Sequence, residues 1–296
     1  AWVSRAGLVA QGMLALDALD EEAFGQVAPA LRVVPVTSEL WPCVVMTFAR
    51  HATIFGDPDA EILWLYDGLA RRGAVNGPSA DDEYLVERCR LRLLLETGEL
   101  TRVRTQLESG PYPRRRFPTI DAHLQLVTGA EERGRAIAEA AARAPGTPAR
   151  DRGELLLLHA AAALRCGRVE EARRVLASAH ANIQRLGVLS AYVTVPREDV
   201  EALLDLQVDP PPAAVMAREL MRAGHGKDAA MVVLTPRELE VLRQSARHGS
   251  LAAVASALSV SVNTIKKQRV SLYAKLGVND LQDAVLRARQ LGLITT

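Results

Sequence analysis

The fold of the C-terminal part of the chain is decided by residues 234–276, which read LTPRELEVLRQSARHGSLAAVASALSVSVNTIKKQRVSLYAKL. Thr235 is a helix-capping residue, Pro236 suits the first helical position, and Glu238 follows the cap by the spacing of a capping box. These signals predict a helix that begins at Pro236 and ends before Gly249. Its apolar positions predict one buried stripe on that helix: Leu239, Leu242 and Ala246.

A short second helix and a longer third helix follow. Ser250 caps the second helix, which we expect over 251–258, and residues 259–261 form a tight turn. The third helix, over about 262–276, is rich in Lys, Arg, Gln and Thr, and a fourth begins after Asp280. A short helix, a three-residue turn and a longer polar helix are the helix-turn-helix arrangement.

The third helix has an apolar face and a polar face. Ile265, Leu272 and Leu276 share one face and are expected to pack inward. Other positions lie on the remaining faces, toward the N-terminal half: Asn263, Lys266, Lys267 and Val270. That half of such a helix enters the DNA major groove. There a lysine donates to guanine, a valine contacts a thymine methyl group, and the helix N-terminus attracts phosphate.

The charge of the chain is unevenly distributed. From Val232 to the end, nine basic residues stand against four acidic ones, a balance of +5. Because the whole chain has a net charge of +1, the remainder carries −4. A basic small domain attached to an acidic large one is typical of nucleic-acid binding.

Several phrases of this C-terminal part resemble the LuxR-type (GerE-like) DNA-binding domain. They are Leu234-Thr-Pro-Arg-Glu, Val260-Ser-Val-Asn-Thr-Ile-Lys266 and Tyr273-Ala-Lys-Leu-Gly-Val278. The resemblance covers about a fifth of the 296 residues. It implies a four-helix domain that binds double-stranded DNA as a homodimer, with the last helix as the dimer contact.

The resemblance also implies roles for single residues. It makes Lys266, Lys267 and Val270 the base-reading residues, and Thr264 and Gln268 contacts to the DNA backbone. Asn263 completes the expected DNA-binding set. On the last helix, the expected dimer contact is the apolar face, which consists of Ala284, Val285 and Ala288.

The sequence departs from the family pattern in three places. The loop before the second helix, Gly249-Ser250, is one residue short. Leu251-Ala252-Ala253 replaces polar residues of the family, and Val270 stands where a polar residue is commoner. The departures from Leu251 to Ala253 motivate a second hypothesis from another class. In it the chain is a helical-repeat scaffold for a protein partner, with a weak or occluded DNA-binding domain.

The sequence pattern of residues 1–207 predicts pairs of helices. Alanine, leucine and arginine are abundant and aromatic residues make up only 4% of the chain, which favours an all-α protein. The expected turn glycines Gly98, Gly129 and Gly167 are 31 and 38 residues apart, which brackets the 34-residue tetratricopeptide unit. The W-x-x-L-G-x-x-Y signature of that repeat is missing, so a generic helical bundle remains the alternative.

A linker is expected over 208–231, because Asp209-Pro-Pro-Pro212 cannot continue a helix. A short helix over Ala213–Ala223 interrupts it. The predicted domains are thus a repeat domain over 1–207, this linker, and a DNA-binding domain over 232–296. The arrangement resembles the C-terminal part of large, maltose-regulon-activator-like LuxR regulators. Their nucleotide-binding motif, G-x-x-x-x-G-K-[ST], does not occur in this sequence.

The sequence contains no motif that supports an enzyme or a metal-binding protein. The six histidines show no metal-ligand spacing, and no H-E-x-x-H or G-x-S-x-G motif occurs, so we expect no enzyme, no catalytic residue, no metal and no cofactor. Three scattered cysteines indicate a reducing compartment, and no run of about 18 apolar residues is present, so a cytoplasmic protein without a membrane partner is expected. The chain begins without Met and in a helical pattern, so we expect it to be a piece of a longer protein.

The repeat domain is expected to sense a small molecule or a protein effector and thereby control dimerisation. Four aromatic residues are interpreted as core, with a ligand pocket between repeats as the alternative: Trp2, Trp41, Trp64 and Tyr66. The sequence leaves the DNA target, the effector, and activation against repression open.

Overall fold

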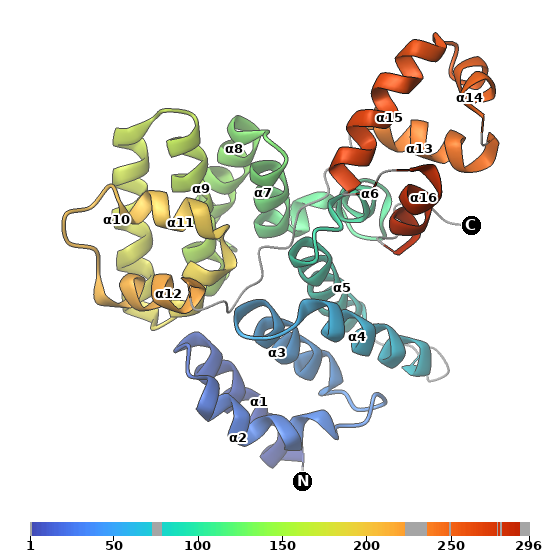
Figure 1. Ribbon diagram of the computed structural model, residues 1–296. Helices are drawn as coiled ribbons and strands as arrows, with labels where there is room; N and C mark the ends of the chain where they lie inside the picture. The colour runs from blue at the N-terminus through green and yellow to red at the C-terminus, as the bar shows by residue number, and fades with distance from the viewer. Residues whose placement is uncertain are drawn as a thin grey trace. The chain divides into compact units, whose positions relative to one another are not determined.

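The computed structural model describes residues 2–72, 79–222, 236–248, 250–276, 278 and 280–290. Within these ranges every regular element is helical and no strand occurs, which confirms the all-α class (Figure 1). The chain divides into two compact units. The larger comprises residues 1–96 and 107–228, and the smaller comprises residues 97–106 and 229–296.

Successive helices of the larger unit pack against their neighbours in the sequence: α1 on α2, α7 on α8, α8 on α9 and α9 on α10 (Figure 1). The bounds in this unit are α1 (Trp2–Asp17), α2 (Glu21–Arg32), α3 (Trp41–Ile54), α4 (Pro58–Arg72), α5 (Ala80–Glu96), η1 (Arg114–Arg116), α7 (Pro118–Val127), α8 (Glu131–Arg143), α9 (Ala149–Arg165), α10 (Val169–Leu186), η2 (Leu189–Thr194), α11 (Arg197–Leu204) and α12 (Pro212–Arg222). Helix α6 (Leu100–Ser109) begins among the residues of the smaller unit.

The turn glycines predicted from the sequence lie between helices. Gly98, Gly129 and Gly167 have φ of 75°, 75° and 74°, in the left-handed region where a Cβ is unfavourable. Leu19, between α1 and α2, adopts φ of 59° without the help of a glycine. The rhythm of helix, glycine and helix is therefore present at all three predicted positions, while the tetratricopeptide-like superstructure remains a prediction.

The largest core of this unit surrounds α9. Four consecutive alanines, Ala160–Ala163, are at most 1% exposed, and their small side chains let α8 and α10 pack closely on α9. Ala214, Ala217 and Met221 of α12 belong to the same core cluster. The short helix expected within 208–231 is therefore present, but it packs into the larger unit instead of standing free in a linker.

A second core joins α1, α2 and α3. Phe24 and Phe48 meet edge to face, with ring centroids 5.7 Å apart. The guanidinium of Arg32 lies 3.7 Å from the centre of the Phe48 ring and also pairs with Glu61. Trp41 is fully buried, so it has the core role favoured from the sequence.

Candidate nucleic-acid interface

The C-terminal part of the smaller unit contains the expected helices. They are α13 (Pro236–His248), α14 (Leu251–Ala257), α15 (Val262–Leu276) and α16 (Leu281–Gln290). Thr235, the expected cap of α13, lies outside the described residues, as do Gly249 and Gly277. The carboxylate of Glu238 accepts a hydrogen bond of 2.8 Å from the hydroxyl of Ser271, which ties α13 to α15.

Two serines fix the entry to the helices of the motif. The hydroxyl of Ser250 accepts a hydrogen bond from the amide of Ala253 at 3.2 Å and so caps α14. The hydroxyl of Ser261 does the same for α15, with the amide of Thr264 at 3.1 Å. Between these helices Ser259 adopts φ of 53°, and this left-handed residue turns the chain from α14 into α15.

The inner face of α15 packs against two small cores. Ile265 is fully buried with Val241, Val254 and Ala255, while Leu272 and Leu276 pack with α13 and α16. All three inward positions predicted for this helix are thus confirmed. On α13 the predicted stripe is partly wrong. Ala246 is exposed, whereas Val241 is 0% exposed, because α13 contacts both α14 and α15 and buries a wider arc.

The outer face of α15 carries the predicted DNA-binding residues. Asn263, Lys266, Lys267 and Val270 are exposed, and the side chain of Val270 is 69% exposed. In the part of the chain that the structure describes, no carboxylate pairs with Lys266 or Lys267. The face therefore presents positive charge that no described acidic group offsets.

Thr264 and Gln268, predicted as backbone contacts, are half-buried. The Thr264 hydroxyl lies 2.8 Å from that of Ser261, and the Oε1 atom of Gln268 is buried without a hydrogen-bond partner. Arg237 of α13 was not singled out from the sequence. It donates a hydrogen bond of 3.4 Å to the carbonyl of Leu258 and so lies beside the turn into α15. Charge count alone did not separate it from the other arginines.

The departure at Leu251 has a packing role. Its side chain is half-buried against the cluster of Val241, Val254, Ala255 and Ile265. Ala252, next to it, is exposed and has no polar group. The first turn of α14 therefore offers a phosphate only its backbone amides.

The dimer contact predicted on α16 stays a prediction, but two of its three residues are used within the domain itself. Ala284 and Ala288 are both 0% exposed, and Val285 packs against the same cluster of α13, α15 and α16. Ala284 and Ala288 are therefore enclosed in the core of their own domain, whereas Val285 is half-buried. Among the described side chains of α16, Gln282 and Asp283 are the exposed ones.

Comparison with known proteins gives a family match in this part of the chain. Residues 232–288 match the model of bacterial regulatory proteins, luxR family. The matched segment contains α13, α14, α15 and most of α16. No curated protein and no solved structure shows a significant match to the chain. The chain thus carries a LuxR-type helix-turn-helix domain, which suggests DNA-binding transcription regulation.

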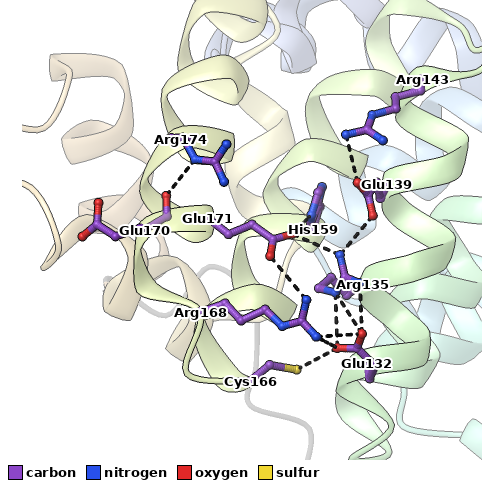
Figure 2. A network of polar contacts seen from close by, with 10 residues as sticks. All are labelled: Glu132, Arg135, Glu139, Arg143, His159, Cys166, Arg168, Glu170, Glu171 and Arg174. Atoms are coloured by element: carbon purple, nitrogen blue, oxygen red, sulfur yellow. Dashed lines mark hydrogen bonds and ion pairs between the residues drawn. The ribbon is translucent and has the colours of Figure 1, made fainter.

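Outside this LuxR-type domain, a network of polar contacts joins α8, α9 and α10 (Figure 2). The ligand atoms of Glu139, His159 and Glu171 all lie within 4.8 Å of one another, a set the sequence spacing did not reveal. Arg135 donates to both carboxylates at 3.0 Å, and His159 Nε2 lies 2.8 Å from Glu171. These contacts, the hydrogen bond with His159 first, lower the pKa of Glu171. The guanidinium already occupies the place a cation needs, so the cluster acts as an ion-pair network between helices.

In the described ranges, no helix combines the length and the apolar character needed to cross a membrane.

Proposed function

We propose that the chain is a sequence-specific DNA-binding transcription regulator in which α15 enters the DNA major groove. The observation that carries the proposal is the exposed outer face of α15, on which Lys266 and Lys267 have no described carboxylate partner. It lies in the segment that matches the luxR family. The same helix is anchored on its inner face, so it can enter the groove as a rigid element.

The chemistry of the outer face supports specific roles. Lys266 and Lys267 donate to guanine O6 and N7 or to phosphate, and Val270 contacts a thymine methyl group. Asn263 lies in the first turn, where the helix dipole also favours a phosphate. Thr264 and Gln268 contact the DNA backbone, and Arg237 adds a phosphate contact beside the turn.

The regulator acts as a homodimer through α16. Because the apolar face of α16 is used within its own domain, the contact falls on the outward side that carries Gln282 and Asp283. The larger unit, a tetratricopeptide-like array as in maltose-regulon-activator-like proteins, senses a small molecule or protein effector. The protein performs no catalysis of its own.

The experiment that tests this function is selection of bound sequences from a random pool of duplex DNA with the full chain. A recovered motif with two half-sites gives base identity and dimer spacing together. The variant Lys266→Ala/Lys267→Ala is expected to lose the motif. On the selected duplex it also lowers the slope of log affinity against log salt by about 0.9 for each phosphate that the variant no longer neutralises.

The matched control is Arg133→Ala/Arg185→Ala, which removes two exposed positive charges from the larger unit. It is expected to recover the same motif as the parent chain. Recovery of the motif by the α15 variant, or loss of the motif by the control, contradicts the assignment of α15 as the reading helix.

The second candidate function is a repeat scaffold for a protein partner with a weak DNA-binding domain. The inward packing of Leu251 and the apolar Ala252 favour it, because they leave α14 without a polar side chain for phosphate in its first turn. A stable partner, together with DNA binding that is weak and blind to sequence, supports this function over the first.

A further inference from the structure

The larger unit contains a cavity of about 180 Å³ between two groups of helices. Residues of α1, α3 and α5 line one side, and the start of α9 with η2 lines the other. A cavity of about 150 Å³ in another protein holds benzene, so this one has room for a small organic molecule. Apolar side chains form much of the wall: Met13, Met46, Ile54, Leu85 and Val188.

The charged part of the wall is dominated by arginine. Four arginines line the cavity, namely Arg50, Arg88, Arg92 and Arg150, against the two carboxylates of Asp151 and Glu154. Asp17, behind the wall, pairs with both Arg50 and Arg150. Glu96 lies 3.6 Å from Arg92, and burial raises its pKa to about 7. Among the residues that line the cavity, the arginines outnumber the carboxylates.

Several of these guanidinium groups have N–H donors without a described hydrogen-bond partner. Each guanidinium has five N–H donors. Arg88 donates one hydrogen bond, from a terminal nitrogen to the carboxylate of Asp151 at 2.6 Å. Arg150 uses its Nε and one terminal nitrogen on Asp17, and its other terminal nitrogen is without a described partner. The Nε of Arg50 is buried and makes no hydrogen bond at all.

The N-terminus of α9 adds to this field. Pro148, which precedes this 17-residue helix, and Arg150 and Asp151 of its first turn line the cavity. The first amides of a helix have no partner within it, and the helix dipole places partial positive charge there. Asp151 occupies part of this field but leaves most donors of Arg88 unused.

We infer that the cavity binds a small organic anion. Its carboxylate or phosphate group is held by Arg88 and Arg150, whose planar guanidinium forks match either group. The carbon body lies against the apolar wall, which excludes a bare inorganic ion as the best ligand. That this anion is the effector of transcription rests on the proposed function, whereas its binding does not.

An anion here joins two parts of the chain that are far apart in sequence. Arg88 belongs to α5 and Arg150 to α9, and the existing pair of Arg150 with Asp17 already links α9 to α1. A ligand held by both arginines stabilises the arrangement that brings these helices together. It thereby shifts any equilibrium in which they separate.

Isothermal titration of the full chain, without DNA, tests the binding site. The two probes are n-butyl phosphate and glutarate, and the uncharged n-butanol is the control ligand. Both anions, or one of them, are expected to bind while butanol does not, and the preferred probe identifies the head group. If neither releases heat at concentrations that saturate a site of about 1 mM dissociation constant, the proposal is wrong.

Variants then separate a binding site from a structural ion-pair network. Arg88→Gln and Arg150→Gln are each expected to weaken binding by about tenfold or more, because each removes charge-assisted hydrogen bonds. Arg185→Gln, on the exposed side of α10, is the matched control and leaves binding unchanged. Asp151→Asn is expected to bind the anion more tightly, because it removes a negative charge from the wall. Weaker binding by Asp151→Asn, or unchanged binding by both arginine variants, overturns the proposal.

The DNA-binding variant distinguishes this proposal from the proposed function. Lys266→Ala/Lys267→Ala is expected to bind the anion like the parent chain. If the parent ignores duplex DNA but binds n-butyl phosphate, the function fails and the cavity site stands. If it binds DNA specifically but takes neither anion, the site fails and the function stands. When both hold, a change of DNA affinity on addition of the anion identifies the effector role.

Discussion

At two nearby positions of α15, replacement of the side chain by alanine is expected to change the stability of the domain by very different amounts. Leu272 is 0% exposed and packs with Leu239, Leu242 and Leu276. Replacing a buried leucine by alanine costs about 2–5 kcal/mol, and a domain of about 60 residues has a total stability of about 3–9 kcal/mol. Leu272→Ala therefore removes from about a fifth to all of the stability of the LuxR-type domain. Val270 is 69% exposed, and Val270→Ala is expected to change stability by less than about 0.5 kcal/mol.

Hydrogen exchange of the full chain, followed by mass spectrometry, measures this difference locally. In Leu272→Ala the protected amides of α13, α14, α15 and α16 are expected to exchange about 30-fold faster or more, as a loss of 2 kcal/mol or more implies. In Val270→Ala they exchange as in the parent, while preference for thymine at one base of the selected site weakens. Equal exchange in the two variants, or faster exchange in Val270→Ala, refutes the orientation of α15 described above.

Two further substitutions test the larger unit. Gly167→Ala is expected to lower the free energy of unfolding by about 1–2 kcal/mol in a denaturant titration, because a Cβ is unfavourable at φ of 74° although nothing crowds it. Gly146→Ala, equally uncrowded and without a positive φ, should be tolerated, and equal losses would contradict this reason. Glu96 has its folded-state pKa raised to about 7, against about 4.3 in an unfolded chain, so its contribution to stability is complete below pH 4.3 and is lost as pH rises through 7. Glu96→Gln should therefore gain stability over the parent as pH rises from 5 to 8, and a gain that does not grow with pH argues against the burial of this carboxyl.

The local features of the LuxR-type domain were predictable from the sequence. Ile265, Leu272 and Leu276 recur with the period of a helix, and that period alone placed them inside. The first helix of this domain, α13, was harder to predict, because it contacts three other helices and a single stripe does not describe its buried arc. Val241 was missed for that reason.

The burial of α16 was not predictable from the family resemblance. Resemblance pointed to the last helix, and the apolar pattern pointed to Ala284 and Ala288. An apolar face, however, is first used to complete the domain's own core, as these two residues do. Which side of α16 remains outward depends on the tertiary structure.

The cavity could not be predicted from the sequence. The residues that form its charged wall meet across long separations, 63 residues for Arg88 and Asp151 and 133 residues for Arg150 and Asp17. The period of a helix says which face is buried but not which distant helix covers it. For the same reason the packing of α12 into the larger unit was not foreseen.

Site-specific photo-crosslinking reports whether the outer face of α15 lies in the major groove. A photo-reactive amino acid is placed at position 270, and at position 133 of α8 as the control. The full chain is then irradiated with its selected duplex. We expect a crosslink from position 270 to a base within the selected half-site and none from position 133. A crosslink from position 270 only to the protein's own chain, while the duplex remains bound, would show that this face does not read the groove.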